Sequence, residues 1–225
     1  DMYAPDAAIC AHWMWSPRGW LKTMGAIDFA GSCTVHVVGG TAAGVAAWWL
    51  GPRRGRFDAG KSTEFDFGDS NSVLFGTFVL WLGWFCFNSG SSLGFEGRIG
   101  VTSLIVATNT AVASAFGVLG GVMYSTALNK GCSFVEHISG GILGSLVAVT
   151  GPCGFVQPWE AGIIGLVGGI VCNMSSDLTR KHGHRIGFDD PVNSVATHLF
   201  PGIWGMIATG LFAGPRYCSK LDGEI

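Results

Sequence analysis

Long stretches of this chain lack charged residues, and the polar residues gather between them. Phe29–Pro52 carries no Asp, Glu, Lys or Arg over 24 residues, and Pro191–Pro215 carries none over 25. About 20 apolar residues in a helix cross the hydrocarbon core of a bilayer. The pattern therefore predicts an all-α polytopic membrane protein. Its helices are expected at about 29–50, 73–93, 99–122, 134–150, 159–175 and 192–213, after a first helix that ends near Trp15.

Composition supports a membrane protein. Charged residues make up 12% of the 225 residues, against about 25% in soluble domains, and the mean hydropathy is +0.42. The 36 glycines have no collagen period. In lipid, small residues let helix backbones approach closely. We therefore interpret spacings such as Gly117–Gly121 and Gly165–Gly169 as helix packing, and a soluble protein with buried helices as the weaker alternative.

Lys and Arg residues are unevenly divided between the two sides of the predicted bundle. Eight fall on one side: Arg53, Arg54, Arg56, Lys61, Lys130, Arg180, Lys181 and Arg185. Five fall on the other: Arg18, Lys22, Arg98, Arg216 and Lys220. The positive-inside rule places the first set in the cytoplasm. We interpret the segment Arg180–Arg185 as a topology anchor on a solvated loop rather than as a metal or anionic-lipid site.

Several classes of chemistry have no motif in this sequence. There is no CxxC, HExxH or phosphate-binding GxxxxGK, and no basic–aromatic stripe that would suit a nucleic acid. We therefore expect no metal, no cofactor, no nucleic-acid partner and no enzymatic activity. The seven cysteines do not form a disulfide framework, although Cys153 and Cys218 both map to the outer side and could pair.

Two histidines, His36 and His198, lie inside the uncharged runs. An ionisable side chain at membrane depth marks a functional site because burying it in hydrocarbon is costly unless it lines a cavity or has a partner. Counting about 1.5 Å per residue puts His36 about 12 Å below the outer surface and His198 about 10 Å above the inner one. The two can therefore meet near the midplane. Two neutral imidazoles can share an N–H···N hydrogen bond and offer a small polar solute one donor and one lone pair.

The outer end of the bundle offers an aromatic and hydroxyl-bearing surface. Trp15 ends the first helix, and Phe87 and Ser91 lie near the end of the third. An aromatic face beside a hydroxyl acceptor suits a small cation through cation–π attraction and a hydrogen bond. The alternatives are that Trp15 belongs to the aromatic belt and that Phe87 only packs.

Several long strings occur in an order that closely resembles the ammonium transporter (Amt/Mep/Rh) family, in its Amt branch. They are DFAGSCTVH at 28–36, GPRRG at 51–55, LGWFCFNSGS at 82–91, NT at 109–110, TGPCG at 150–154 and DDPVNSVATH at 189–198. The match runs from about Tyr3 to Phe212. The resemblance implies an eleven-helix bundle of two inverted five-helix repeats, assembled as a homotrimer with a pore in each subunit. Residues 1–225 would form one transmembrane domain, from the end of the fourth helix to the tenth, about seven of the eleven helices.

The resemblance also assigns candidate site residues. The family's twin pore histidines carry over onto His36 and His198. Its outer recruitment site carries over onto Trp15 and Ser91, and one phenylalanine of the gate carries over onto Phe87. The second gate phenylalanine belongs to a part of the family pattern that this sequence does not contain.

Three further residues carry over as structural positions near that site. Asp28 is expected to cap a helix and shape the site, because an Asp at a helix start stabilises its N-terminal N–H groups. Asn88 and Thr150 match the motifs, as does Trp84, which is expected to pack. Two departures are that the stretch from Trp15 to Asp28 is one residue longer than the family spacing, and that Asn193 stands where many members have an acid.

The function that the resemblance implies is transport of ammonium or ammonia, and of methylammonium, by an integral, multi-pass protein of the plasma membrane. Its partners would be the substrate, the lipid bilayer and two further copies of the chain. An ammonium sensor with little net transport is the alternative.

Overall fold

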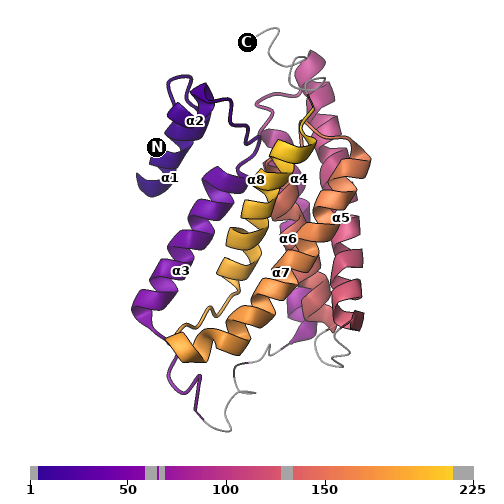
Figure 1. Ribbon diagram of the computed structural model, residues 1–225. Coiled ribbons are helices and arrows are strands. Elements are labelled where there is room, and N and C mark those ends of the chain that lie inside the picture. The colour runs from indigo at the N-terminus through magenta and orange to yellow at the C-terminus, as the bar shows by residue number, and fades with distance from the viewer. Residues whose placement is uncertain (1–4, 59–64, 66–68, 128–133, 215–225) are drawn as a thin grey trace.

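The computed structural model describes residues 5–58, 65, 69–127 and 134–214. The regular elements in these ranges are all helical, and the long helices run alongside one another (Figure 1). In the first part of the chain they are α1 (Pro5–Trp15), α2 (Trp20–Thr23), η1 (Ser32–Val37), α3 (Val38–Leu50) and α4 (Ser70–Gly90). In the second part they are α5 (Gly97–Ala127), α6 (Phe134–Thr150), α7 (Pro158–Ile186), η3 (Val195–Leu199) and α8 (Phe200–Phe212).

Within the described residues, five helical segments are long and apolar enough to cross a membrane, and the shorter α6 is also apolar. The five are Ser32–Leu50, Ser70–Gly90, Gly97–Ala127, Pro158–Ile186 and Val195–Phe212. The prediction of an all-α polytopic membrane protein is confirmed.

Helix boundaries differ from the prediction by a few residues at α4 and α5, and two larger differences stand out. The short helix α2 was not expected, and α7 continues past residue 175 to Ile186. The interpretation of Arg180–Arg185 as a solvated loop is therefore wrong, because these residues form the last turns of α7. Basic side chains are favourable there because they face the negative end of the helix dipole. Gly187, with φ 64°, then ends the helix in the left-handed conformation that glycine adopts readily.

Helices α5, α6 and α7 meet through glycine. A Cβ on Gly117 of α5 would lie 2.5 Å from the carbonyl oxygen of Gly141 of α6. A Cβ on Gly169 of α7 would lie within 3.0 Å of the carbonyl oxygens of both. Three backbones are therefore in direct contact at one level, which only residues without a side chain permit. The interpretation of the glycines as packing positions holds for this trio.

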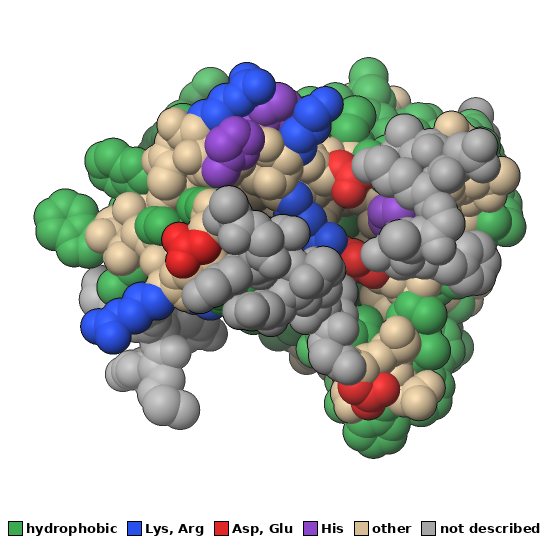
Figure 2. Space-filling model, turned by 90° about the horizontal axis from the view of Figure 1, so that it is seen from below, with side chains coloured by type: hydrophobic (Ala, Val, Ile, Leu, Met, Phe, Trp, Pro, Cys, Tyr) green, Lys and Arg blue, Asp and Glu red, His purple; other side chains and the backbone are tan. Residues whose placement is uncertain are grey.

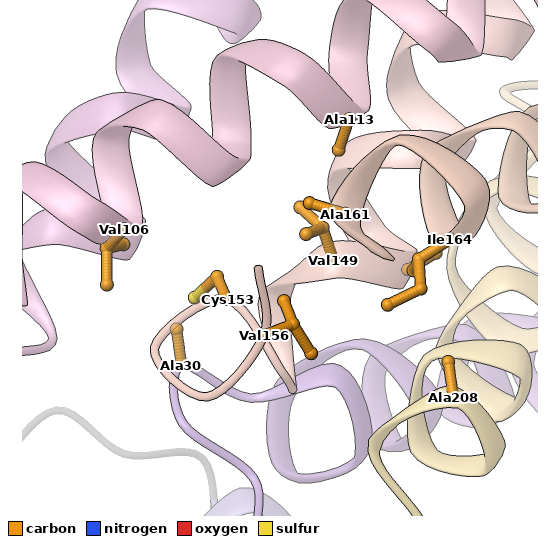
Figure 3. Packing of buried hydrophobic residues seen from close by; sticks show 10 residues of the cluster. Ala30, Val106, Ala113, Val149, Cys153, Val156, Ala161, Ile164 and Ala208 are labelled. Carbon is orange, nitrogen blue, oxygen red and sulfur yellow. The ribbon is translucent and has the colours of Figure 1, made fainter. Parts of the chain in front are cut away.

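The apolar core packs α5, α6 and α7 against α8 and against the segment before η1. Figure 3 shows its small side chains directed toward a common centre from α5, α6, α7, α8 and the segment before η1. The Asn109 side chain of α5 donates hydrogen bonds of 2.8 Å to the carbonyl oxygens of Cys153 and Val156. This amide holds the turn between α6 and α7 against α5.

One end of the bundle, which we call the basic end, carries the larger set of Lys and Arg residues. It is the lower end in Figure 1, where α3 and α7 end and α8 begins. Figure 2 looks onto it and shows Lys, Arg and His side chains gathered at the upper edge, further basic and acidic side chains nearer the middle, and hydrophobic side chains around much of the rim. Lys61 and Lys130, two members of the predicted set, lie outside the described residues.

Candidate functional site

Asp28 organises the first histidine segment. Its side chain is buried, with 4% of the residue exposed. One carboxylate oxygen accepts the backbone N–H groups of Gly31 and Ser32 at 3.1 and 2.7 Å. The other accepts those of Cys33 and Thr34, and the Thr34 hydroxyl, each at 2.9 Å. The carboxylate therefore caps the N-terminus of η1 with four backbone bonds, in the manner of an N-cap acid.

The chain then enters a π-helical turn that ends at His36. Gly31 has φ 110°, a value that a residue with a Cβ adopts only under strain. The His36 N–H donates to the Gly31 carbonyl oxygen, five residues earlier, at 3.0 Å. This wide turn is rare in proteins and occurs mainly at functional sites. Nothing in the hydrophobic pattern indicated it.

The second histidine segment repeats this construction. Asp190 accepts the N–H groups of Ser194 and Val195 at 3.0 and 2.8 Å. Asn193 takes a positive φ of 55°, as Gly31 does, and η3 then ends in the turn of His198. Sequence reasoning gave Asp190 no role. The equal separation of eight residues from Asp28 to His36 and from Asp190 to His198 was the available signal.

The structure brings the two histidines together, from segments 162 positions apart in the sequence. Their ring centroids are 5.2 Å apart, and the ring planes differ by 11°. The His36 ring also stacks with that of Trp84, with centroids 5.2 Å apart and planes that differ by 21°. His36 is 7% exposed. The three side chains form what we call the ring stack: Trp84, His36 and His198.

The near-parallel rings do not form the N–H···N hydrogen bond that the sequence suggested. Instead, His36 Nε2 and His198 Nδ1 are both buried with no hydrogen-bond partner among the described residues. Buried polar atoms normally have a partner. These two imidazole nitrogens are therefore available to form hydrogen bonds with a small solute that can donate or accept.

Of the outer candidates, Phe87 lies nearest the ring stack. It is 41% exposed, and its ring centroid is 5.9 Å from that of His36. The Ser91 hydroxyl donates to the Phe87 carbonyl oxygen at 2.8 Å. The Trp15 indole N–H donates to the Asp28 carbonyl oxygen at 2.6 Å, and Trp15 is 42% exposed. Among the described residues no hydrogen bond joins Trp15 to Ser91, and the backbones of α1 and α4 are not adjacent. Trp15 is linked to the His36 segment through Asp28, and Ser91 is linked to His36 through Phe87.

A buried network fixes the remaining structural candidates. The Trp84 indole N–H donates to the Thr150 hydroxyl oxygen at 3.0 Å. The Asn88 amide donates to the Thr110 hydroxyl oxygen at 3.0 Å, and the Thr150 hydroxyl lies 3.3 Å from the Asn88 carbonyl oxygen. The network sets the orientation of the Trp84 ring, against which His36 stacks.

The predicted pairing of Cys153 with Cys218 is untested, because Cys218 lies outside the described residues. Cys153 is fully buried, and its thiol donates to the Thr150 carbonyl oxygen at 3.4 Å. A small buried thiol behaves as an apolar residue in such a position.

Fold and site together define a class: a polytopic helical membrane protein with two capped, interrupted helices that carry a pair of facing histidines at its centre. The model of the Ammonium Transporter Family matches residues 6–224. The chain therefore belongs to that family, and the prediction made from its motifs is confirmed.

Individual relatives agree. A putative ammonium transporter of Synechocystis sp. is 39% identical over 207 residues, which cover 91% of this chain and 46% of the relative. The ammonium transporter Amt2 of Archaeoglobus fulgidus is 38% identical, covering 93% and 45%. Among solved structures, Mep2 of Candida albicans has a TM-score of 0.80 at 30% identity, covering 97% of this chain and 46% of that one. A sensor Amt protein has a TM-score of 0.80 at 31% identity, covering 95% and 53%. This chain spans about half the length of the curated relatives it matches.

Proposed function

We propose that the protein containing this chain conducts ammonium, as ammonium ion or ammonia, and methylammonium across a membrane. The observation that carries the proposal is the ring stack, with unpartnered nitrogens on both His36 and His198. Membership of the family supports the substrate class, and five apolar spans support a path through a bilayer. We place the basic end in the cytoplasm and the protein in the plasma membrane as a homotrimer.

The path begins at the outer end. The half-exposed rings of Trp15 and Phe87 offer π faces to a small cation, and the Ser91 hydroxyl offers a lone pair. The ammonium ion gives its proton to solvent water near the partly exposed Phe87, and neutral ammonia then passes His36 and His198. The physical reason is desolvation, because a bare cation in an apolar passage costs several kcal/mol or more, whereas a neutral molecule with hydrogen-bond partners costs little. Potassium has no proton to lose and is excluded.

The test is substitution of His36 in the protein expressed from its complete reading frame. We expect His36→Ala to abolish or sharply alter ammonium conduction while expression and assembly stay near wild-type levels. His12→Ala is the matched control, because His12 is exposed on α1 and lies outside the ring stack. Wild-type uptake and selectivity in His36→Ala would return His36 to a packing role.

A second variant tests whether the passing species is neutral. His198→Glu places an ionisable carboxyl beside His36, and a carboxylate in a low-dielectric passage attracts cations. We expect this variant either to block transport or to admit potassium alongside ammonium, as measured by ionic currents. Unchanged ammonium flux with potassium still excluded would place selectivity elsewhere, at Phe87.

An ammonium sensor is the second candidate, favoured by the structural similarity to a sensor Amt protein. The same site would bind ammonium without passing it on. Flux measurements in vesicles separate the two functions: ammonium binding with no flux above that of protein-free vesicles would favour the sensor, and flux that His36→Ala removes would favour the transporter.

A further inference from the structure

The basic end contains a recess of about 250 Å³ whose described lining includes no side chain of the ring stack. It lies between the chain that follows α3, the last turns of α7 and the segment before η3. Three arginines (Arg53, Arg56 and Arg180) and two aspartates (Asp189 and Asp190) belong to its lining. Among the described residues, the lining therefore has one more positive than negative side chain. Figure 2 looks onto the end of the bundle where it opens.

Both aspartates are already engaged. The Arg53 guanidinium forms a two-pronged ion pair with Asp189, at 2.7 Å from Nε and 3.1 Å from Nη2, and the Arg53 backbone N–H adds a third bond at 3.1 Å. Asp190 accepts the two N–H groups that cap η3. Of the other arginines in the lining, Arg180 pairs with Glu136.

Arg56 is left with few partners. Its side chain is only 18% exposed, and its Nε lies 3.4 Å from an Asp189 oxygen without hydrogen-bond geometry. The rings of Phe57 and Phe65 lie 5.5 and 5.6 Å from its guanidinium carbon. Within the described residues the guanidinium donates no hydrogen bond. The Nε of Arg56 is buried without a hydrogen-bond partner among these residues, and burying a charged donor without an acceptor is costly.

We propose that this recess binds a phosphate-type oxyanion and that Arg56 is its principal ligand. A planar guanidinium matches two phosphate oxygens in a fork, which explains why an arginine with free donors suits this anion. A volume of about 250 Å³ corresponds to about eight water molecules, which is room for a phosphate group with some of its hydration. The phosphate can come from a soluble phosphate or from the headgroup of an anionic lipid, since the recess opens at the basic end.

The experiment measures binding to the protein expressed from its complete reading frame. Inorganic phosphate is titrated by calorimetry into the protein in phosphatidylcholine nanodiscs. In parallel, thermal unfolding is compared between nanodiscs of phosphatidylcholine and nanodiscs that also contain phosphatidylglycerol. We expect Arg56→Gln to weaken phosphate binding at least tenfold, or to abolish the stabilisation by phosphatidylglycerol. Loss of the first signal identifies a soluble phosphate, and loss of the second alone identifies a lipid headgroup.

Arg54→Gln is the matched control, because Arg54 is an exposed neighbour that does not line the recess. We expect it to change either signal less than twofold. Equal effects of the two variants would mean diffuse attraction by the basic end and would overturn the proposal, as would a wild-type protein that responds to neither probe. If Arg56→Gln does not fold, Arg56→Lys keeps the charge but loses the planar fork. It is expected to weaken the response at least threefold, and an unchanged response would overturn the proposal.

Discussion

The two histidine segments, 28–50 and 190–212, have the same plan. Each begins with a capping aspartate, passes through a residue of positive φ three positions later and turns into a π-helical segment. Each places its histidine eight positions after the aspartate and a glycine four positions after the histidine. The glycines pack reciprocally: Gly40 lies against Leu199, and Gly202 lies against Val37 and the Ser32 carbonyl oxygen.

The two segments differ in what holds their beginnings. Asp28 is buried and accepts five hydrogen bonds, and the Ser32 hydroxyl ties the same turn to the Val147 carbonyl oxygen of α6 at 2.8 Å. Asp190 accepts only two, and its neighbour Asp189 is held by charged side chains at the basic end. The start of segment 28–50 is therefore held by buried neutral hydrogen-bond donors. The start of segment 190–212 is held by fewer such donors and by the ion pairs of the neighbouring Asp189. The difference should appear as unequal stability and unequal sensitivity to pH.

The largest expected effect is at Asp28. Asp28→Ala leaves four backbone N–H groups and a hydroxyl without their acceptor, and each unsatisfied buried donor costs about 1–3 kcal/mol. We expect a loss of about 4 kcal/mol or more, seen as failure to fold or as a large drop in the thermal unfolding midpoint in detergent.

Asp190→Ala is the matched comparison, with two donors released instead of five. We expect it to fold and to lose about 1–3 kcal/mol. Equal losses at the two aspartates would remove the asymmetry between the segments.

The next effect tests the reciprocal glycine contacts. A Cβ on Gly40 would lie 2.5 Å from the Leu199 nitrogen, and one on Gly202 would lie 2.7 Å from the Ser32 carbonyl oxygen. Overpacking of this kind costs about 1–3 kcal/mol, so Gly40→Ala and Gly202→Ala should lower the unfolding midpoint by similar amounts. Gly39→Ala and Gly210→Ala, where a Cβ meets open space, are the controls and should be neutral or slightly stabilising. A loss in only one of the two test variants would show that the contacts are not equivalent.

The segment 28–50 is also bound by Trp15, whose indole N–H donates to the Asp28 carbonyl oxygen. Trp15→Leu removes the aromatic face and the indole N–H that bonds to Asp28, whereas Trp15→Phe keeps a face. A cation–π contribution of about 0.5–2 kcal/mol corresponds to about a two- to thirty-fold loss of apparent ammonium affinity in Trp15→Leu, with Trp15→Phe between it and wild type. The control is Trp20→Leu, an exposed tryptophan outside the candidate site. Unchanged transport kinetics in Trp15→Leu would assign Trp15 to the aromatic belt.

The smallest expected effect is the pH dependence of stability that arises from Asp189, next to the segment 190–212. The hydrogen bonds from Arg53 lower the pKa of the Asp189 carboxyl. A lowered pKa adds stability above the ordinary carboxyl pKa of about 3.9 and loses it as the pH falls through the folded value. The difference in unfolding midpoint between wild type and Asp189→Asn should therefore be constant above about pH 5 and shrink toward pH 3. A difference that does not change with pH would contradict the ion-pair account.

Much of the fold could be predicted because membrane-spanning helices exclude charged residues, so that uncharged runs in the sequence mark them. The uncharged runs gave the helices, and residues 134–150 were placed with both ends correct. The end of α7 was missed because a charge marks where a helix leaves the apolar layer and not where it stops. The helix continues in water until Gly187 ends it.

The meeting of His36 and His198 was allowed by the sequence, but the arrangement of their rings was not predictable. Motif and spacing indicated His36 and His198, yet the facing of their rings depends on partners far along the chain. Trp84 holds His36 from one side through a bond to Thr150, 66 positions away. The π-helical turns depend on which backbone N–H groups bind Asp28 and Asp190. The spacing of apolar residues contains no information about these hydrogen bonds.

The contact of Gly117, Gly141 and Gly169 has a consequence for time scales. Backbones that touch have no side chains between them to repack, so α5, α6 and α7 should behave as one rigid body with the slowest amide hydrogen exchange in the molecule. Phe87, by contrast, is 41% exposed and lies outside this unit. Spectroscopic labels on the three-helix unit should therefore provide a fixed frame against which motion at Phe87 can be measured.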